Sequence, residues 1–314
     1  MKRAGMTILT FMSGASVTSA EIASQPELWI RAGDQASKFG SLLAAPGERV
    51  LAIGCGTSAF VAQAYALLRE GAGLGETDWA YASEAPTHRS YDRVVAITRS
   101  GTTTEVLEAL RSVPAGVRRV GITGVTGEPV DALIDDRVLL DYADEQSVVQ
   151  TRFPTTLLTA MRVALGQDVG SSIADVQKVL SEPLPVDAAK YEHFVFLGTD
   201  WRMALAHEAA LKIREAAQAW SESYPAMDYR HGPIAVATSA SVIYFFGAPP
   251  TGLIEAAEAT GATVIADDID PLAQLVRAQR LAVELAEHKG LNPDTPRALT
   301  RSVVLTSNQD GNPS

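Results

Sequence analysis

Residues 49–58 read Arg49-Val50-Leu51-Ala52-Ile53-Gly54-Cys55-Gly56-Thr57-Ser58. A short apolar run ends in glycine, and residues 59–70 follow with the pattern of an amphipathic helix. A continuously apolar strand is typical of a parallel sheet, because helices cover both of its faces. The stretch therefore predicts a strand over residues 49–54 and then a helix, which is the repeating unit of an α/β fold.

The same pattern recurs through the first part of the chain. Further buried strands are predicted at 93–98, 119–123 and 138–142, and helices at 21–44 and 104–110. We therefore expect a first α/β subdomain over residues 21–182.

The pattern restarts after a proline-containing linker that begins at residue 183. The elements predicted there are strands at 194–198, 241–246 and 262–266 and helices at 201–218 and 271–289. They define a second subdomain over residues 186–306. Prolines early in residues 291–305 prevent this segment from extending the last helix, so we expect it to cross the surface.

The two ends of the chain fit neither subdomain. Residues 1–20 are expected to form a disordered leader, and residues 307–314 a disordered tail. A secretory signal is the alternative for the leader, because Lys2 and Arg3 precede a mildly apolar stretch.

Composition restricts the class of function. A chain of 314 residues with 46% hydrophobic residues can form two domains with full cores. The net charge of −11 opposes a basic nucleic-acid-binding face, and no apolar stretch approaches the about 18–20 residues of a membrane span. Cys55 is the single cysteine, and no Cys/His cluster has zinc spacing. We expect a cytoplasmic protein without metal or other cofactor and without nucleic-acid or membrane partners.

Two turns between a strand and a helix are candidate anion sites. Residues 54–58 open a helix, whose free N–H groups favour an anion, although such a turn also serves simply to pack helix on strand. Residues 98–104 hold five hydroxyls and the guanidinium of Arg99. N-capping of a helix requires only one hydroxyl, so the surplus favours a phosphate ligand over capping alone.

The helix predicted at 201–218 is mostly apolar, but Glu208, Lys212 and Glu215 lie on one stripe of it. An exposed ladder of salt bridges is one interpretation of this spacing. The downstream loop favours a reactive cluster instead, because His231 lies between an arginine and a Gly-Pro turn. Histidine is the residue best suited to proton transfer near neutral pH.

Taken together, these residues resemble the sugar isomerase (SIS) domain family, including the isomerase half of glucosamine-6-phosphate synthase and the tagatose-6-phosphate ketose/aldose isomerase-like proteins. The resemblance runs from residue 21 to about residue 305. Its anchors are residues 54–58, 98–103, 145–156, 208–215, 230–233 and 292–297. It implies two flavodoxin-like αβα subdomains, each with a mostly parallel sheet flanked by helices, in a homodimer that shares its active sites.

The resemblance also implies a site for a sugar phosphate. Residues that correspond to phosphate-binding positions of the family are Gly56, Thr57, Ser58, Thr98, Arg99, Ser100 and Thr103, with Gln150 nearby. Glu215 corresponds to the base that moves a proton between sugar C1 and C2. His231 corresponds to the ring-opening histidine, which the neighbouring subunit often supplies. Glu208 and Lys212 correspond to helix residues that frame the site.

Two departures from the family pattern matter. The synthase carries a glutaminase domain, whereas residues 1–3 offer no N-terminal cysteine, so no glutaminase activity is expected. The synthase tail also holds a lysine that forms an imine with the sugar, and Arg301 stands at that place here. Arginine cannot act as an amine nucleophile. Arg301 or Lys212 is instead a candidate to stabilise a developing negative oxygen.

The resulting prediction is an enzyme that opens the ring of an amino-sugar 6-phosphate and abstracts the proton at C2. The substrate would belong to the glucosamine 6-phosphate or N-acetylglucosamine 6-phosphate class. Isomerisation, deamination and, for an acetylated amine, dehydration all stay open as outcomes. A non-catalytic sugar-phosphate sensor is the alternative of another class, and the lack of a basic helix-turn-helix segment before residue 45 counts against it.

Overall fold

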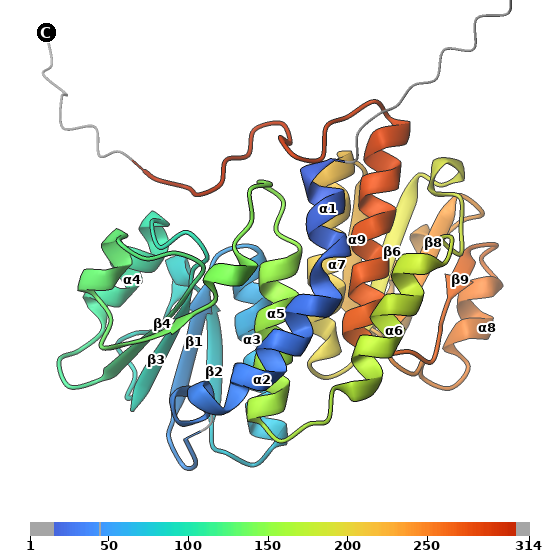
Figure 1. Cartoon of the computed structure of the whole chain (residues 1–314). Coiled ribbons are helices and arrows are strands. Elements are labelled where there is room, and N and C mark those ends of the chain that lie inside the picture. Colours follow the sequence, from blue (N-terminus) through green and yellow to red (C-terminus); the bar gives the residue numbers. More distant parts are fainter. Residues whose placement is uncertain (1–15, 44, 306–314) are drawn as a thin grey trace, which may run out of the picture.

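The computed structural model of the chain describes residues 16–43 and 45–305 and contains two parallel β-sheets, each flanked by helices (Figure 1). The strands are β1 (Val50–Gly54), β2 (Thr77–Tyr81), β3 (Arg93–Ile97), β4 (Arg118–Thr123), β5 (Asp136–Leu139), β6 (His193–Gly198), β7 (Trp220–Pro225), β8 (Ser241–Phe246) and β9 (Thr263–Ile265). The first sheet has the order β2-β1-β3-β4-β5 and the second β7-β6-β8-β9. The predicted α/β fold with two similar halves is confirmed.

Helices cover both faces of each sheet. The helices are α1 (Val17–Ala23), α2 (Gln25–Leu43), α3 (Thr57–Gly71), α4 (Thr104–Ser112), α5 (Arg152–Ala164), α6 (Gly170–Ser181), α7 (Arg202–Ala217), α8 (Leu253–Glu258) and α9 (Pro271–His288). Within β1, Val50 and Ala52 face one core cluster, whereas Leu51 and Ile53 face another. Successive side chains of a strand point to opposite faces, so an apolar run of this kind requires cover on both sides.

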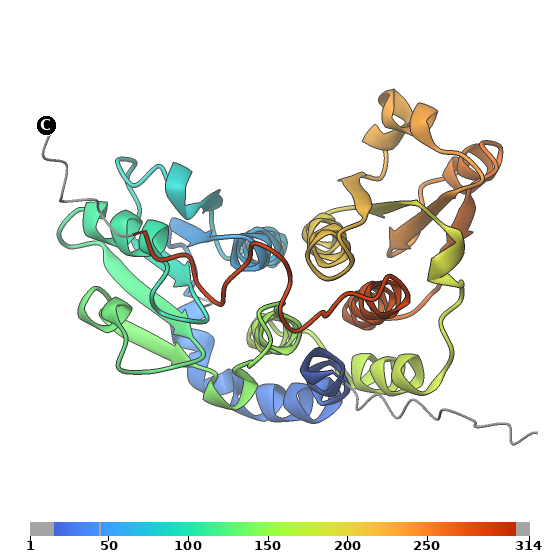
Figure 2. The ribbon, with the colours of Figure 1, turned by 90° about the horizontal axis from the view of Figure 1, so that it is seen from above.

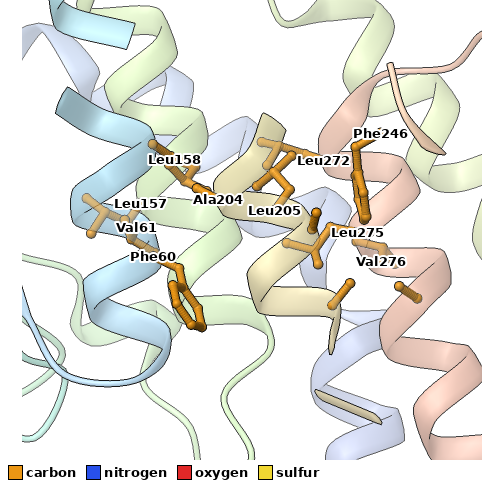
Figure 3. Packing of buried hydrophobic residues seen from close by; sticks show 14 of the residues in the cluster. Phe60, Val61, Leu157, Leu158, Ala204, Leu205, Phe246, Leu272, Leu275 and Val276 are labelled. Carbon is orange, nitrogen blue, oxygen red and sulfur yellow. The ribbon is translucent and has the colours of Figure 1, made fainter. Parts of the chain in front are cut away.

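The two halves share one continuous hydrophobic core. Seen from above, α3 and α7 face each other between the sheets, with α5 and α9 beside them (Figure 2). Figure 3 shows Phe60 and Leu157 of the first half in the same cluster as Leu205 and Leu275 of the second. Because apolar side chains of both halves exclude water together, the halves are held as one packed unit.

Some elements pack across the predicted boundary between the subdomains. Helix α6 lies in the predicted first subdomain but packs against α9, and α1 packs against α9 as well. Residues 291–305 cross the surface as expected and run from the end of α9 along the first half (Figures 1 and 2). The boundaries 21–182 and 186–306 stay predictions.

One part of the predicted leader is wrong. Residues 17–20 are helical, because they belong to α1. Ser16 caps this helix, and Asp294 accepts hydrogen bonds from the backbone N–H groups of Val17 and Thr18 at 3.0 and 2.8 Å. A carboxylate at a helix N-terminus satisfies free N–H groups and complements the helix dipole. Residues 1–15 of the predicted leader and residues 307–314 of the predicted tail lie outside the described residues.

Two strands, β2 and β7, were not predicted, and the predicted helix at 21–44 is divided at Ser24 into α1 and α2. Across residues 16–43 and 45–305, no helix is both long and apolar enough to span a membrane.

Candidate functional site

The candidate site begins where β1 turns into α3. A Cβ on Gly54 would lie 2.5 Å from the backbone carbon of Ser58, so only glycine allows the helix to start this close to the strand. Gly56 precedes the helix with φ +52°. Thr57 and Ser58 form the first turn of α3 and are buried. Carboxyl ends of parallel strands are where open α/β sheets bind ligands.

The hydroxyl-rich turn follows β3, the strand beside β1. Thr98 and Ser100 are buried, and Thr98 Oγ1 accepts a hydrogen bond from the backbone N–H of Gly101 at 3.2 Å. Thr103 occupies the N-cap position of α4, but its side chain makes no capping hydrogen bond. N-capping therefore does not explain why this turn is rich in hydroxyls.

Arg99 supports the turn from a buried position. Its guanidinium donates to the backbone oxygens of Ser147 and Arg301 at 3.2 and 3.4 Å and lies 3.9 Å from the carboxylate of Glu145. Burial lowers the pKa of Arg99, although an arginine remains a cation in proteins. The side chain thus joins the turn to the loop before α5 and to the C-terminal tail.

A cavity of about 170 Å³ lies between these turns, α7 and the tail. Six of the residues predicted for the site line it: Gly56, Thr57, Thr103, Gln150, Glu215 and Arg301. Sequence reasoning missed the other tail residues in its lining: Leu299, Thr300, Ser302 and Val303. The tail carries no periodic pattern that would reveal such contacts.

Lys212 forms the centre of a buried charge cluster on α7. Its ammonium group lies 2.5 Å from Glu215 Oε2, 3.2 Å from Glu208 Oε1 and 3.1 Å from Thr57 Oγ1. Thr57 in turn donates to Glu208 Oε1 at 3.1 Å. The exposed-ladder interpretation is wrong, because Glu208 and Lys212 are only 2% and 1% exposed. Packing of α3 against α7 covers this stripe.

Burial and charge act in opposite directions within this cluster. Burial would lower the pKa of Lys212, but the carboxylates of Glu208 and Glu215 raise it above its ordinary value. Burial raises the pKa of Glu208 to about 7, and Lys212 only partly opposes this. The cluster therefore holds a stable ammonium ion, a carboxyl group that titrates near neutrality, and Glu215 at the cavity.

His231 is not brought to this cavity within one chain. It ends a short 3₁₀ helix, η5 (Asp228–His231), and its side chain is exposed. It does not line the cavity to which Glu215 belongs. Within the part of the chain that the structure describes, Glu215 and His231 are therefore not assembled into one site.

The guanidinium of Arg301 is paired. It contacts both carboxylate oxygens of Asp144 at 2.6 and 2.7 Å and donates to the backbone oxygen of Glu145. In this arrangement the charge of Arg301 is compensated by Asp144, and its role toward a sugar oxygen stays a prediction.

A larger cavity of about 620 Å³ lies elsewhere, beside the linker between the halves. Its lining includes Lys178, Glu182, Asp267 and Arg277, but none of the predicted site residues. Its volume alone does not make it the site, because it lacks a convergent set of reactive groups. No group of three His, Cys, Asp or Glu side chains within the described ranges could hold a metal ion.

Comparison with known proteins agrees with this fold. No family model matches the chain. Glutamine–fructose-6-phosphate aminotransferase of Thermus thermophilus is 29% identical over 82% of this chain and 52% of that protein. The corresponding protein of Pyrococcus horikoshii is 28% identical over 68% of this chain and 43% of its own length. The chain thus spans about half the length of these curated relatives.

Solved structures show the same architecture over almost the whole chain. Glucosamine-6-phosphate deaminase of Thermotoga maritima superposes with a TM-score of 0.79 at 26% identity, covering 92% of this chain and 100% of that one. Tagatose-6-phosphate ketose/aldose isomerase of Escherichia coli superposes with a TM-score of 0.72 at 18% identity, covering 90% and 96%. The chain thus resembles SIS-domain proteins in sequence and has their fold.

Proposed function

We propose that the protein is an SIS-type enzyme that acts on an amino-sugar 6-phosphate of the glucosamine 6-phosphate or N-acetylglucosamine 6-phosphate class. The observation that carries this proposal is the pairing of Lys212 with Glu215 beside a cavity that the phosphate-type turn between β1 and α3 also lines. A ligand module needs anion binding, but it does not need a carboxylate held by a buried ammonium ion.

The proposed mechanism follows from this placement. The turns after β1 and β3 hold the 6-phosphate through hydroxyls and backbone N–H groups. Anchoring at this remote group orients the sugar carbons toward Glu215. After ring opening by His231, Glu215 removes the C2 proton, and Lys212 stabilises the negative charge that develops on the sugar oxygen.

The amine decides the outcome of the reaction. With a free amine, protonation of the enolamine at C1 gives an imine, which water hydrolyses to a ketose phosphate and ammonia. Protonation at C1 of an enediol gives isomerisation. With an acetylated amine, loss of the C3 hydroxyl as water competes, which makes the reaction a dehydration. The name of the Thermotoga maritima neighbour, a glucosamine-6-phosphate deaminase, supports the first of these.

We propose in addition that the active form is a homodimer in which the partner supplies His231. The exposed position of His231 and its separation from the cavity of Glu215 support this. Each active site would then combine Glu215 of one protomer with the histidine of the other.

The test is proton exchange in deuterated water. The protein is incubated with the 6-phosphates of glucosamine, N-acetylglucosamine, galactosamine and fructose, and exchange is followed by NMR at C2 of the amino sugars and at C1 of the fructose. We expect exchange with at least one amino sugar. Glu215→Gln should reduce its rate by at least about 10²-fold, the typical contribution of a general base, and leave the affinity for the sugar phosphate nearly unchanged.

Glu255→Gln is the matched control, because Glu255 is an exposed glutamate on α8. Full activity of the Glu215→Gln variant would remove Glu215 as the base. If the protein binds these sugar phosphates but none of them exchanges a proton or yields a product, the non-catalytic sugar-phosphate sensor is favoured.

A further inference from the structure

The C-terminal tail places Ser302 among the hydroxyls expected to bind phosphate. Ser100 Oγ and Thr102 Oγ1 donate hydrogen bonds to Ser302 Oγ at 3.1 and 2.9 Å, and Thr103 Oγ1 lies 3.2 Å from the same atom. One hydroxyl donates one hydrogen bond and accepts two, so three partners saturate Ser302. Several donors that converge on one oxygen are also what a phosphate oxygen requires.

The cavity is small for a hexose phosphate while the tail lies there. Its volume of about 170 Å³ is well below the roughly 300 Å³ at the lower end of small-molecule pockets. The five consecutive tail residues 299–303 form part of its wall. Displacement of the tail would therefore enlarge this site for a sugar phosphate.

The contacts that hold residues 301–305 of the tail are mainly hydrogen bonds and one ion pair. The backbone oxygen of Val303 accepts from the N–H of Thr104 at 3.1 Å, and Arg301 pairs with Asp144. The apolar side chain of Val303 is 50% exposed, so burial contributes little. Ala298 has φ +61°, a left-handed conformation that is unfavourable for alanine. A segment held in this way is suited to exchange with a ligand.

We propose that the tail is a built-in competitor for the phosphate group, in which Ser302 occupies the hydroxyl cluster of Ser100, Thr102 and Thr103 until a phosphate monoester displaces it. The proposal rests on the proposed function, since it assumes that phosphate binds at this turn. In the ligand-free enzyme, the tail then occupies the phosphate position. Part of the binding free energy of the phosphate is used to displace the tail.

Two full-length variants test the competition in opposite directions. Ser302→Ala removes the competing hydroxyl and should bind inorganic phosphate and glucosamine 6-phosphate about 2- to 10-fold more tightly, the range of a net hydrogen-bond contribution. Ser302→Asp offers two carboxylate oxygens to the same hydroxyls and should bind both ligands more weakly. Isothermal titration calorimetry measures both affinities.

Val304→Ala is the control, because Val304 lies on the same tail with a side chain that is 60% exposed, and its affinities should equal those of the unaltered protein. Weaker or unchanged binding by Ser302→Ala would overturn the competitor role, and weaker binding would make Ser302 a phosphate ligand. No binding of either ligand to any variant would overturn the phosphate site itself. If Ser302→Ala does not fold, Ser302→Gly is tested in its place, because it also removes the hydroxyl.

Discussion

At the scale of single residues, Lys212 decides the character of the site. A fully buried ammonium ion is costly unless acceptors surround it, and here two carboxylates and one hydroxyl do so. The same ammonium ion positions Glu215 through a contact of 2.5 Å. One residue thus both compensates buried charge and orients the proposed base. Arg301, by contrast, pairs with Asp144 at the tail.

The raised pKa of Glu208 predicts a pH dependence of stability. Burial raises this pKa from 4.5 to about 7 in the folded protein. Between these values the folded state keeps a proton that the unfolded state has released, so the free energy of unfolding decreases as the pH rises from about 4.5 to about 7. Glu208→Gln, which does not titrate, should lose less stability over this interval.

Thermal unfolding of both proteins at about pH 5 and pH 8 measures this difference. The melting temperature of the unaltered protein should fall more between the two conditions than that of Glu208→Gln. Equal decreases in the two proteins would show that Glu208 does not contribute to the pH dependence.

At the scale of elements, helix α5 depends on a carboxylate that precedes it. Glu145 is fully buried and accepts hydrogen bonds from the backbone N–H groups of Thr151, Arg152 and Phe153 at 2.6, 3.2 and 3.1 Å. Glu145 therefore satisfies free N–H donors at the N-terminus of α5. It acts as a capping residue does, although it lies several positions earlier in the chain. Helix α5 packs against α2 and α3, and Val148 and Gln150, which precede it, line the cavity of the site.

We expect Glu145→Gln to destabilise the protein by about 2–3 kcal/mol. The amide replaces one acceptor oxygen by a donor that faces other donors, and hydrogen bonds to charged groups contribute about 1.5–3 kcal/mol. Urea unfolding measures the loss, with Glu182→Gln as an exposed control. A loss below about 0.5 kcal/mol would contradict the capping role, since surface substitutions typically lie within this range.

At the scale of the whole molecule, three separate parts of the fold border the proposed site. The turns come from the first half, Glu208 to Glu215 from α7 of the second half, and the covering segment from residues 299–303. The shared core of α3, α5, α7 and α9 fixes the first two relative to each other (Figure 3). The exposed His231 would complete the arrangement from a second copy of the chain.

Subunit complementation tests this shared site. Glu215→Gln and His231→Asn should each be nearly inactive alone. A mixed dimer of the two contains one site with both native residues, so random 1:1 assembly should restore roughly one quarter of the activity of the unaltered protein. Activity is measured after the variants are unfolded together and refolded. A mixture of Glu215→Gln with Glu215→Ala is the control and should stay inactive.

Sedimentation must first show that the refolded mixture of Glu215→Gln and His231→Asn contains dimers. If these dimers recover no activity, each protomer builds its site alone. A monomer that is fully active would contradict the homodimer itself.

Local sequence pattern by itself determined the central strands, the glycine turns after β1 and β6, and the charged stripe of α7. The strands β2 and β7 escaped detection because their sequences, TDWAY and WSESYP, lack a continuous apolar run. Helical and strand periodicity is a property of neighbouring residues, so it can be read without knowledge of the rest of the fold.

Only the tertiary structure decided which of these groups meet. Lys212 and Thr57 are 155 positions apart, Ser100 and Ser302 are 202 apart, and Val17 and Asp294 are 277 apart. Whether the stripe of α7 is an exposed ladder or a buried cluster depends on the packing of α3 against it, and the first turn of α1 receives a carboxylate from the tail. Contacts between distant residues leave no periodic pattern along the chain, because they form only when the whole core packs.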